Sequence, residues 1–234
     1  MERILIIGGA RALGAAVARQ AVEDGYDVVV GARDLAAAQE LAAEIGATTV
    51  RVDLQDETTI AAAAEQLADG VDHLVMTGSA PHDARATDLD HDRLVTAFTA
   101  KVIGPMLVAK HFAPVLRAGG SIVLFSGVVG WRPGPGSLVK GVTNGAVEYV
   151  ARHLAADLAP VRVNAISPGV VDSGTWDRLG DGKAALLSKS GAGTLVGRHG
   201  EIEDVVDTVR WLLRAGFITG ETIHLEGGAR HKTA

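Results

Sequence analysis

Short runs of apolar residues alternate along the chain with longer helix-like stretches. The short runs are rich in Val and Ile and are continuous rather than alternating. That pattern is typical of strands that are buried on both faces of a sheet. Strands are predicted at Arg3–Ile7, Asp27–Val30, Thr48–Val52, His73–Met76, Ser121–Phe125, Val161–Ile166 and Thr222–Leu225.

Strands that alternate with helices predict an α/β fold with a doubly wound, mostly parallel sheet of about seven strands and helices on both faces. No repeat or interdomain linker interrupts the 234 residues, so residues 1–234 are expected to form one domain. Residues 171–200 are the least regular part, and we expect a substrate lid there rather than a plain surface insertion. Helices are predicted at Gly14–Asp24, Leu35–Ile45, Asp92–Leu116 and Gly141–Leu158.

Composition narrows the class of protein. Hydrophobic residues make up 47 % and aromatic residues 4 %, so the core must consist mainly of Ala, Val, Leu and Ile. A net charge of -6 without a basic run argues against nucleic acid or an anionic membrane as a partner. The chain has no cysteine, which excludes disulfides and thiol catalysis. Without a signal-peptide pattern or a membrane-spanning run, a soluble cytoplasmic protein is expected.

A glycine-rich turn follows the first predicted strand and opens the first helix. Gly8, Gly9 and Gly14 permit a tight turn and a close backbone approach, and the helix N-terminus offers N–H groups to a pyrophosphate. The context predicts dinucleotide binding and a Rossmann-like sheet. Ala12 stands inside this turn, where its methyl group and its preference for negative φ make the match imperfect.

The turn resembles the glycine motif of the short-chain dehydrogenase/reductase family, and further motifs follow in the family's order. Asn164–Gly169 is similar to its Asn-x-x-x-Pro-Gly, and Ile218–Gly220 and Glu226–Gly228 are similar to its C-terminal signature. The resemblance covers nearly all of residues 4–228 and implies a nicotinamide cofactor. The cofactor-binding residues that we predict are Gly8, Arg11, Leu13, Gly14, Arg33, Asp53, Gly78, Pro168, Gly169 and Ser173.

The end of the second strand indicates which cofactor is preferred. Family members that prefer NAD have an Asp there, whereas this chain has Ala32 followed by Arg33. Arg11 lies in the glycine turn, so two guanidinium groups are expected beside the adenosine ribose. Such groups suit a 2′-phosphate, and we therefore predict NADP(H). The alternative is that Arg33 only ends a surface turn.

The resemblance fails where the family's chemistry resides. The positions that match its catalytic Ser, Tyr and Lys hold Gly127, Lys140 and Asn144 in this chain. A tyrosine from elsewhere is not expected to replace the missing one. Tyr26 precedes the second strand, on the predicted adenosine side, and Tyr149 falls on roughly the opposite face of the helix from Lys140.

A second exchange accompanies the first. The family's upstream Asn corresponds to Lys101, so the chain has Lys where the family has Asn and Asn144 where the family has Lys. One hypothesis is that Lys101 takes over ribose binding and local positive charge, with Asn144 as its hydrogen-bond partner. The equally weighted alternative is a solvated helix lysine.

Other side chains are weaker candidates for chemistry. Lys140 is the remaining candidate acid, although a lysine serves as an acid near neutral pH only if burial or a second ammonium lowers a pKa that is ordinarily about 10.4. The alternative, which we favour, is a surface lysine beside Gly141. Ser126 would orient a substrate if its hydroxyl turned inward. His82 either hangs over the substrate or lies at a polar loop tip, which we favour. Trp131 and Trp176 either bracket a substrate mouth or pack in the core.

These features predict an atypical NADP(H)-dependent oxidoreductase that reduces a C=O, C=N or C=C bond of a small organic substrate. The alternative is a non-redox enzyme, such as an isomerase, cyclase or dehydratase, or an NADP-binding regulatory protein on the same scaffold. No metal is implied, because the histidines lack ligand-like spacing. The resemblance also implies a homodimer or homotetramer formed through the helices at residues 92–116 and 141–158.

Overall fold

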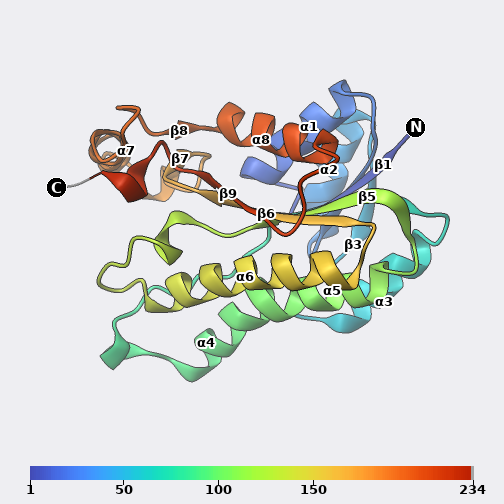
Figure 1. Ribbon diagram of the computed structural model, residues 1–234, viewed down its shortest axis with the longest axis horizontal. Coiled ribbons are helices and arrows are strands. Elements are labelled where there is room, and N and C mark those ends of the chain that lie inside the picture. The colour runs from blue at the N-terminus through green and yellow to red at the C-terminus, as the bar shows by residue number, and fades with distance from the viewer. Residues whose placement is uncertain (233–234) are drawn as a thin grey trace.

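The computed structural model describes residues 1–232. Within them the main sheet has seven parallel strands in the order β3-β2-β1-β4-β5-β6-β9 (Figure 1). This architecture confirms the predicted doubly wound α/β fold. The strands are β1 (Arg3–Ile7), β2 (Asp27–Ala32), β3 (Thr48–Arg51), β4 (Val71–Met76), β5 (Leu116–Phe125), β6 (Arg162–Pro168) and β9 (Thr222–Leu225).

Helices cover both faces of the sheet (Figure 1). On β1, Leu5 and Ile7 pack into the core cluster that α3, α5 and α6 cover. Ile4 and Ile6 point to the other face, where α1, α2 and α8 close a second cluster. Successive side chains of a strand alternate between faces, so a continuous apolar run fills both cores. The helices are α1 (Ala12–Glu23), α2 (Leu35–Ile45), α3 (Glu57–Gln66), α4 (His91–Phe98), α5 (Gly104–Phe112), α6 (Leu138–Asp157), α7 (Gly182–Ala192) and α8 (Ile202–Arg214).

The predicted helix over residues 92–116 is wrong as one continuous element. A π-helical segment, Thr99–Ile103, separates α4 from α5, and β5 already begins at Leu116. A Cβ on Gly104 would lie 2.6 Å from the backbone oxygen of Leu54, so only glycine lets the chain pass this closely. The widened turn places Lys101 at the break, and such π-bulges are frequent at functional sites.

The strand order places a topological switch point between β1 and β4. β2 lies on one side of β1 and β4 on the other, so their following loops diverge at the carboxyl edge of the sheet. Ligands of open α/β sheets bind in the crevice that forms at such a point. The loops after β1, β2, β3 and β4 all reach this edge.

Residues 171–200 form an ordered excursion from the sheet. β7 (Val171–Asp172) pairs in parallel with β8 (Gly200–Glu201), and α7 lies between them. The ammonium of Lys183 lies 2.7 Å from carboxylate oxygens of both Asp172 and Asp177, so it ties the start of α7 to the chain before it.

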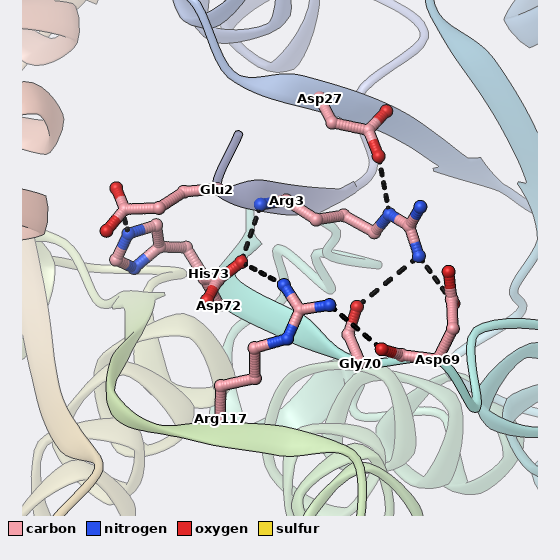
Figure 2. A network of polar contacts seen from close by, with 8 residues as sticks. All are labelled: Glu2, Arg3, Asp27, Asp69, Gly70, Asp72, His73 and Arg117. Carbon is pink, nitrogen blue, oxygen red and sulfur yellow. Dashed lines mark hydrogen bonds and ion pairs between the residues drawn. The ribbon is translucent and has the colours of Figure 1, made fainter.

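A charge network fastens the opposite, amino edge of the sheet (Figure 2). The backbone N–H of Arg3 donates to Asp72, and its Nε lies 2.6 Å from Asp27 on the neighbouring strand β2. Arg117, from β5, binds Asp72 at 2.7 Å. The carboxylates of Asp69 and Asp27 raise the pKa of Arg3. The network therefore links β1, β2, β4 and β5 far from the carboxyl-edge loops.

None of the helices in residues 1–232 is both long and apolar enough to cross a membrane.

Candidate functional site

The glycine turn after β1 has the geometry that its sequence predicts. Gly8 adopts a positive φ of 83°, and its N–H donates to the carbonyl of Gly31 at 2.8 Å. A Cβ on Gly14 would overlap the backbone oxygen of Gly8, which makes a side chain there impossible without moving the turn. The turn thus leaves the N-terminus of α1 facing the crevice, where its N–H groups favour an anion.

Ala12 departs from the expectation of a negative φ. Its φ is +47°, and it is the one non-glycine residue of the described part with a positive φ. The left-handed region costs an L-residue roughly 1–2 kcal/mol. The turn therefore forces Ala12 into the conformation that a glycine would adopt without strain.

A cavity of about 370 Å³ opens beside this turn at the switch point. Arg11 and Arg33 are both exposed side chains on its wall, next to the buried Ala32. Within residues 1–232, no carboxylate forms an ion pair with either guanidinium group. The cavity wall therefore offers two guanidinium groups without an ion-pair partner, together with the carboxylates of Asp34 and Asp53. Five of the predicted cofactor residues line it, namely Gly8, Arg11, Arg33, Asp53 and Gly78.

The other predicted cofactor residues lie around this cavity rather than on its wall. Gly14 and the half-buried Leu13 belong to the first turn of α1. Pro168 ends β6, and the N–H of Gly169 donates to the carbonyl of Leu225 at 2.8 Å. The hydroxyl of Ser173 lies 3.0 Å from that of Thr175. Pro168, Gly169 and Ser173 lie at the end of β6 or just after it, at the same carboxyl edge of the sheet.

Gly127 and Asn144 meet at the end of β5. A Cβ on Gly127 would lie 2.8 Å from the side-chain nitrogen of Asn144. Asn144 is 7 % exposed, and its side-chain amide has no hydrogen-bond partner among residues 1–232. The amide nitrogen and oxygen of Asn144 are not fully buried, so water reaches them and a ligand could take the place of that water.

Ser126 does not turn toward this amide. Its buried hydroxyl lies 2.8 Å from Oε1 of Glu148 and 3.1 Å from the backbone oxygen of Asn144. The indole N–H of Trp131 donates to the same Glu148 oxygen at 2.8 Å. Trp131 also packs edge to face against His224, with ring centroids 4.8 Å apart. Glu148 therefore holds both side chains: the hydroxyl of Ser126 is not turned inward, whereas Trp131 is 50 % exposed and its place at a substrate mouth stays a prediction.

Lys140, in the first turn of α6, forms an ion pair with the loop after β4. Its ammonium lies 2.7 Å from Oδ1 of Asp83, and both side chains remain partly exposed. One residue further on, the N–H of Ala84 donates to the carbonyl of Gly136 at 3.1 Å. The loop after β4 is therefore fastened to the segment before α6, and Asp83 holds the ammonium at the entrance of α6.

Lys101 is embedded at the π-helical break. Burial lowers its pKa from the ordinary value to about 8. No hydrogen bond joins it to Asn144 within the described residues, so the expected partnership between these two side chains is absent from the structure. Lys101 is only half-buried, so the alternative of a solvated helix lysine stays open.

His82, Trp176 and Tyr26 are the remaining side chains that the sequence singled out. His82 is 1 % exposed, and its Nε2 accepts the N–H of Asp90 at 3.4 Å, so it is not at a solvated loop tip. The indole N–H of Trp176 donates to the carbonyl of Val171 at 2.9 Å. Tyr26 stacks edge to face on His73 at the amino edge of the sheet, which corrects its expected place on the adenosine side.

Sequence reasoning missed two carboxylates of this region. One is Asp83, which no spacing along the chain links to Lys140. Glu148 lies one helical turn after Asn144, so its position on the same face of α6 was a usable signal. Its burial depends on the packing of Trp131 and β9, which no local pattern reveals.

Known proteins resemble this chain over almost its whole length. Residues 8–230 match the family model described as enoyl-(acyl carrier protein) reductase. The cyclic-di-GMP-binding biofilm dispersal mediator protein of Escherichia coli (strain K12) is 30 % identical over 97 % of this chain and 96 % of its own length. The short-chain dehydrogenase/reductase ucsE of Acremonium sp. is 30 % identical over 97 % and 94 %.

A solved structure gives the same picture in three dimensions. A small-chain dehydrogenase in complex with NADPH has a TM-score of 0.86 and 28 % identity, covering 99 % of this chain and 100 % of that one. The similarity therefore extends to the whole arrangement of strands and loops that surrounds the crevice.

Proposed function

The chain belongs to the short-chain dehydrogenase/reductase family, and from this premise we propose that it is an NADP(H)-dependent oxidoreductase with a remodelled catalytic centre. Its substrate is a small organic molecule with a reducible C=O, C=N or C=C bond. NADPH, when bound, supplies the hydride. The protein holds the reactants and manages the charge and the proton.

One observation carries the cofactor assignment. Arg11 and Arg33 line the crevice cavity without a carboxylate partner in the described residues, and Ala32 stands where a ribose-binding Asp would repel a phosphate. An Arg fork binds phosphate through two parallel hydrogen bonds. The NADPH held by the similar small-chain dehydrogenase agrees with this assignment.

The catalytic proposal is that Gly127, Lys140 and Asn144 replace the family's Ser, Tyr and Lys. The unpartnered amide of Asn144 fills the space that a side chain at position 127 would need. It would therefore donate the hydrogen bond to the substrate oxygen. A preorganised donor at the atom where negative charge develops is among the largest contributions to catalysis.

The two lysines divide the remaining work. The ammonium of Lys140, oriented by Asp83, would stabilise an alkoxide or enolate as it forms. Lys101, with its pKa lowered to about 8 by burial, would supply the proton near neutral pH. Positive charge on both lysines favours an anionic over a cationic intermediate, so ketones and enones fit better than iminium ions.

Cofactor binding and turnover test this function. Dissociation constants for NADPH and NADH would be measured by titration, followed by NADPH oxidation on a panel of ketones, enones and imines. We expect NADPH to bind at least about tenfold more tightly than NADH, because one charge-assisted pair contributes on the order of 1.5–3 kcal/mol. Equal affinities would overturn the cofactor assignment, and the absence of oxidation on every substrate would overturn the redox function.

The exchange of the family's catalytic residues keeps a second function open. A non-redox enzyme or an NADP-binding regulatory protein would bind NADPH in the same crevice and leave it unoxidised. The E. coli relative named for cyclic-di-GMP binding and biofilm dispersal makes a regulatory role a specific alternative. NADPH binding without oxidation would favour it.

We also propose a homo-oligomer. Large apolar side chains are exposed on α4, the π-helical segment, α5 and α6, where a second copy would cover them. Light scattering after size exclusion would identify a dimer or tetramer, and a monomer would contradict this proposal. The exposed apolar side chains that a second copy would cover are Val95, Ile103, Met106, Val142 and Tyr149.

A further inference from the structure

A second cavity, of about 610 Å³, adjoins the catalytic end of the sheet. It lies between the loop after β5, the segment after β6, the helix α7 and the turn after β9. Val128 on its wall directly follows Gly127, and Gly169 directly follows Pro168. A molecule in this cavity would therefore lie close to Gly127 and to the end of β6, whereas Lys101, Lys140 and Asn144 do not line the cavity.

The interior of the cavity is mainly apolar. Val128, Val170, Leu186, Val196 and Leu225 contribute to its wall. A volume of this size lies in the range of pockets that hold small organic ligands, on the order of 300–1,000 Å³. The wall would favour a ligand with a hydrocarbon body.

Charged side chains also line the cavity, and some of them compensate one another. Arg198 binds Asp204 through two hydrogen bonds of 2.6 and 2.8 Å. Glu226 lies 3.3 Å from Arg230, a residue that is not on the wall. These pairs leave little free charge for a ligand.

Arg132 and Lys189 differ from Arg198 and Glu226 in having no ion-pair partner. Within residues 1–232, neither lies within ion-pair distance of a carboxylate, and both line the cavity. Nη1 of Arg132 lies 3.4 Å from the carbonyl oxygen of Gly193, at the end of α7, so the guanidinium group spans from the loop after β5 to that helix. The cavity therefore combines an apolar wall with two uncompensated cations from facing elements.

We propose that this cavity binds a substrate with an apolar body and an anionic group, such as a carboxylate, and that Arg132 and Lys189 hold the anion. Arg offers a planar fork of donors and Lys a point charge, and both suit a carboxylate. The inference rests on the proposed function only in identifying the occupant as the substrate. Residues 171–200 would then form the lid over that substrate.

Calorimetric titration of the full-length protein with octanoate and with octanamide tests the charge preference. The two probes share one hydrocarbon chain and differ in charge. At low ionic strength we expect octanoate to bind at least about tenfold more tightly, and we expect added salt to reduce this ratio. Arg132→Gln and Lys189→Gln should each weaken octanoate binding by about threefold to tenfold and leave octanamide binding unchanged.

Two further variants test whether the probes bind in this cavity. Arg178→Gln removes an exposed cation of the same segment that does not line the cavity, so both affinities should remain as in the wild type. Leu186→Trp fills the cavity and should abolish binding of both probes, while an unchanged melting temperature shows that the fold is intact. Trp176, which donates to the carbonyl of the wall residue Val171, gives a fluorescence signal for occupancy.

Equal affinity for octanoate and octanamide would overturn the proposal, as would no binding of either probe. The same loss of octanoate binding in Arg178→Gln would also overturn it, because the effect would then be one of net charge. None of these measurements requires turnover. Failure to oxidise NADPH would therefore refute the redox function and leave the ligand preference standing.

Discussion

The side-chain nitrogen of Asn144 lies 2.8 Å from the point where a Cβ on Gly127 would stand. The backbone of Gly127 is extended, with φ 169°, so its conformation does not require glycine. The neighbouring amide is the reason that a side chain is excluded. The two residues are therefore coupled: the loss of a side chain at 127 makes room for the amide of 144.

Gly127→Ala tests this coupling. The added methyl would displace the end of a side chain rather than backbone, so the free energy of unfolding should fall by only about 1 kcal/mol. Turnover should fall at least about tenfold, because the displaced amide is the proposed oxyanion donor.

Asn144→Ala should lower turnover to a similar extent, and the double variant should be no worse than either single one. Gly145→Ala is the matched control, since a Cβ there meets no atom within 4 Å. Additive losses in the double variant would show that the two positions act independently.

Ala12→Gly should stabilise the protein. It relieves a φ of +47° at a position that costs an L-residue roughly 1–2 kcal/mol, and part of this gain is offset by the flexibility of glycine in the unfolded chain. We expect a net gain of about 0.5–1 kcal/mol in urea unfolding. Ala16→Gly, within α1, should instead lose about 1 kcal/mol. A loss at both positions would refute the strain at Ala12.

Lys101 should make stability depend on alkaline pH. Its pKa is lowered to about 8 in the folded protein, whereas the unfolded chain retains the ordinary value near 10.5. Between these values the unfolded state binds more protons, so stability should rise as pH increases through the window from about 8 to 10.5. Below pH 8 both states carry the charge, and the desolvation penalty is fully present.

Lys101→Met removes the penalty, so it should stabilise the protein most at pH 7 and progressively less as pH rises toward 10. Urea unfolding at several pH values measures this difference. Lys101→Arg stays charged throughout and should show no such rise. A difference between wild type and Lys101→Met that is independent of pH would show that the amine is well hydrated.

Arg33→Ala should weaken NADPH binding by about ten- to a hundredfold and leave NADH binding nearly unchanged, because only NADPH carries the 2′-phosphate. Arg11→Ala should have the same selectivity. Arg93→Ala, an exposed residue on α4 outside the cavity, is the control for net charge. Parallel losses for both cofactors in Arg33→Ala would place the guanidinium group elsewhere than at the phosphate.

The sheet was predictable because its strands are buried on both faces. Each strand therefore consists of an unbroken run of apolar residues, which is visible in the sequence. The glycine turn was predictable because its role is local: Gly8 and Gly14 are needed by the backbone path itself. Arg11 and Arg33 were found from their place beside the ends of strands, and the strand order brings them to one cavity.

Long-range partners were not predictable in the same way. Asp83, in the loop after β4, and Lys140, at the start of α6, are separated by more than fifty positions, and only the folded chain joins them. Ser126 has a buried acceptor in Glu148, and a strand pattern does not reveal which neighbour a hydroxyl will find. The π-helical break at Lys101 does not interrupt the helix-like pattern of the sequence, so one helix was predicted straight through it.

The charge network of Figure 2 ties four strands together at the edge of the sheet opposite to the crevice. Such a division lets mutation act on the two edges separately. Substitutions in the carboxyl-edge loops change the catalytic site. The charge network at the amino edge and the two hydrophobic cores keep the chain folded. During evolution, a protein with this arrangement can accumulate substitutions that lower its activity and still remain folded. An exchange of several catalytic residues requires such poorly active but folded variants.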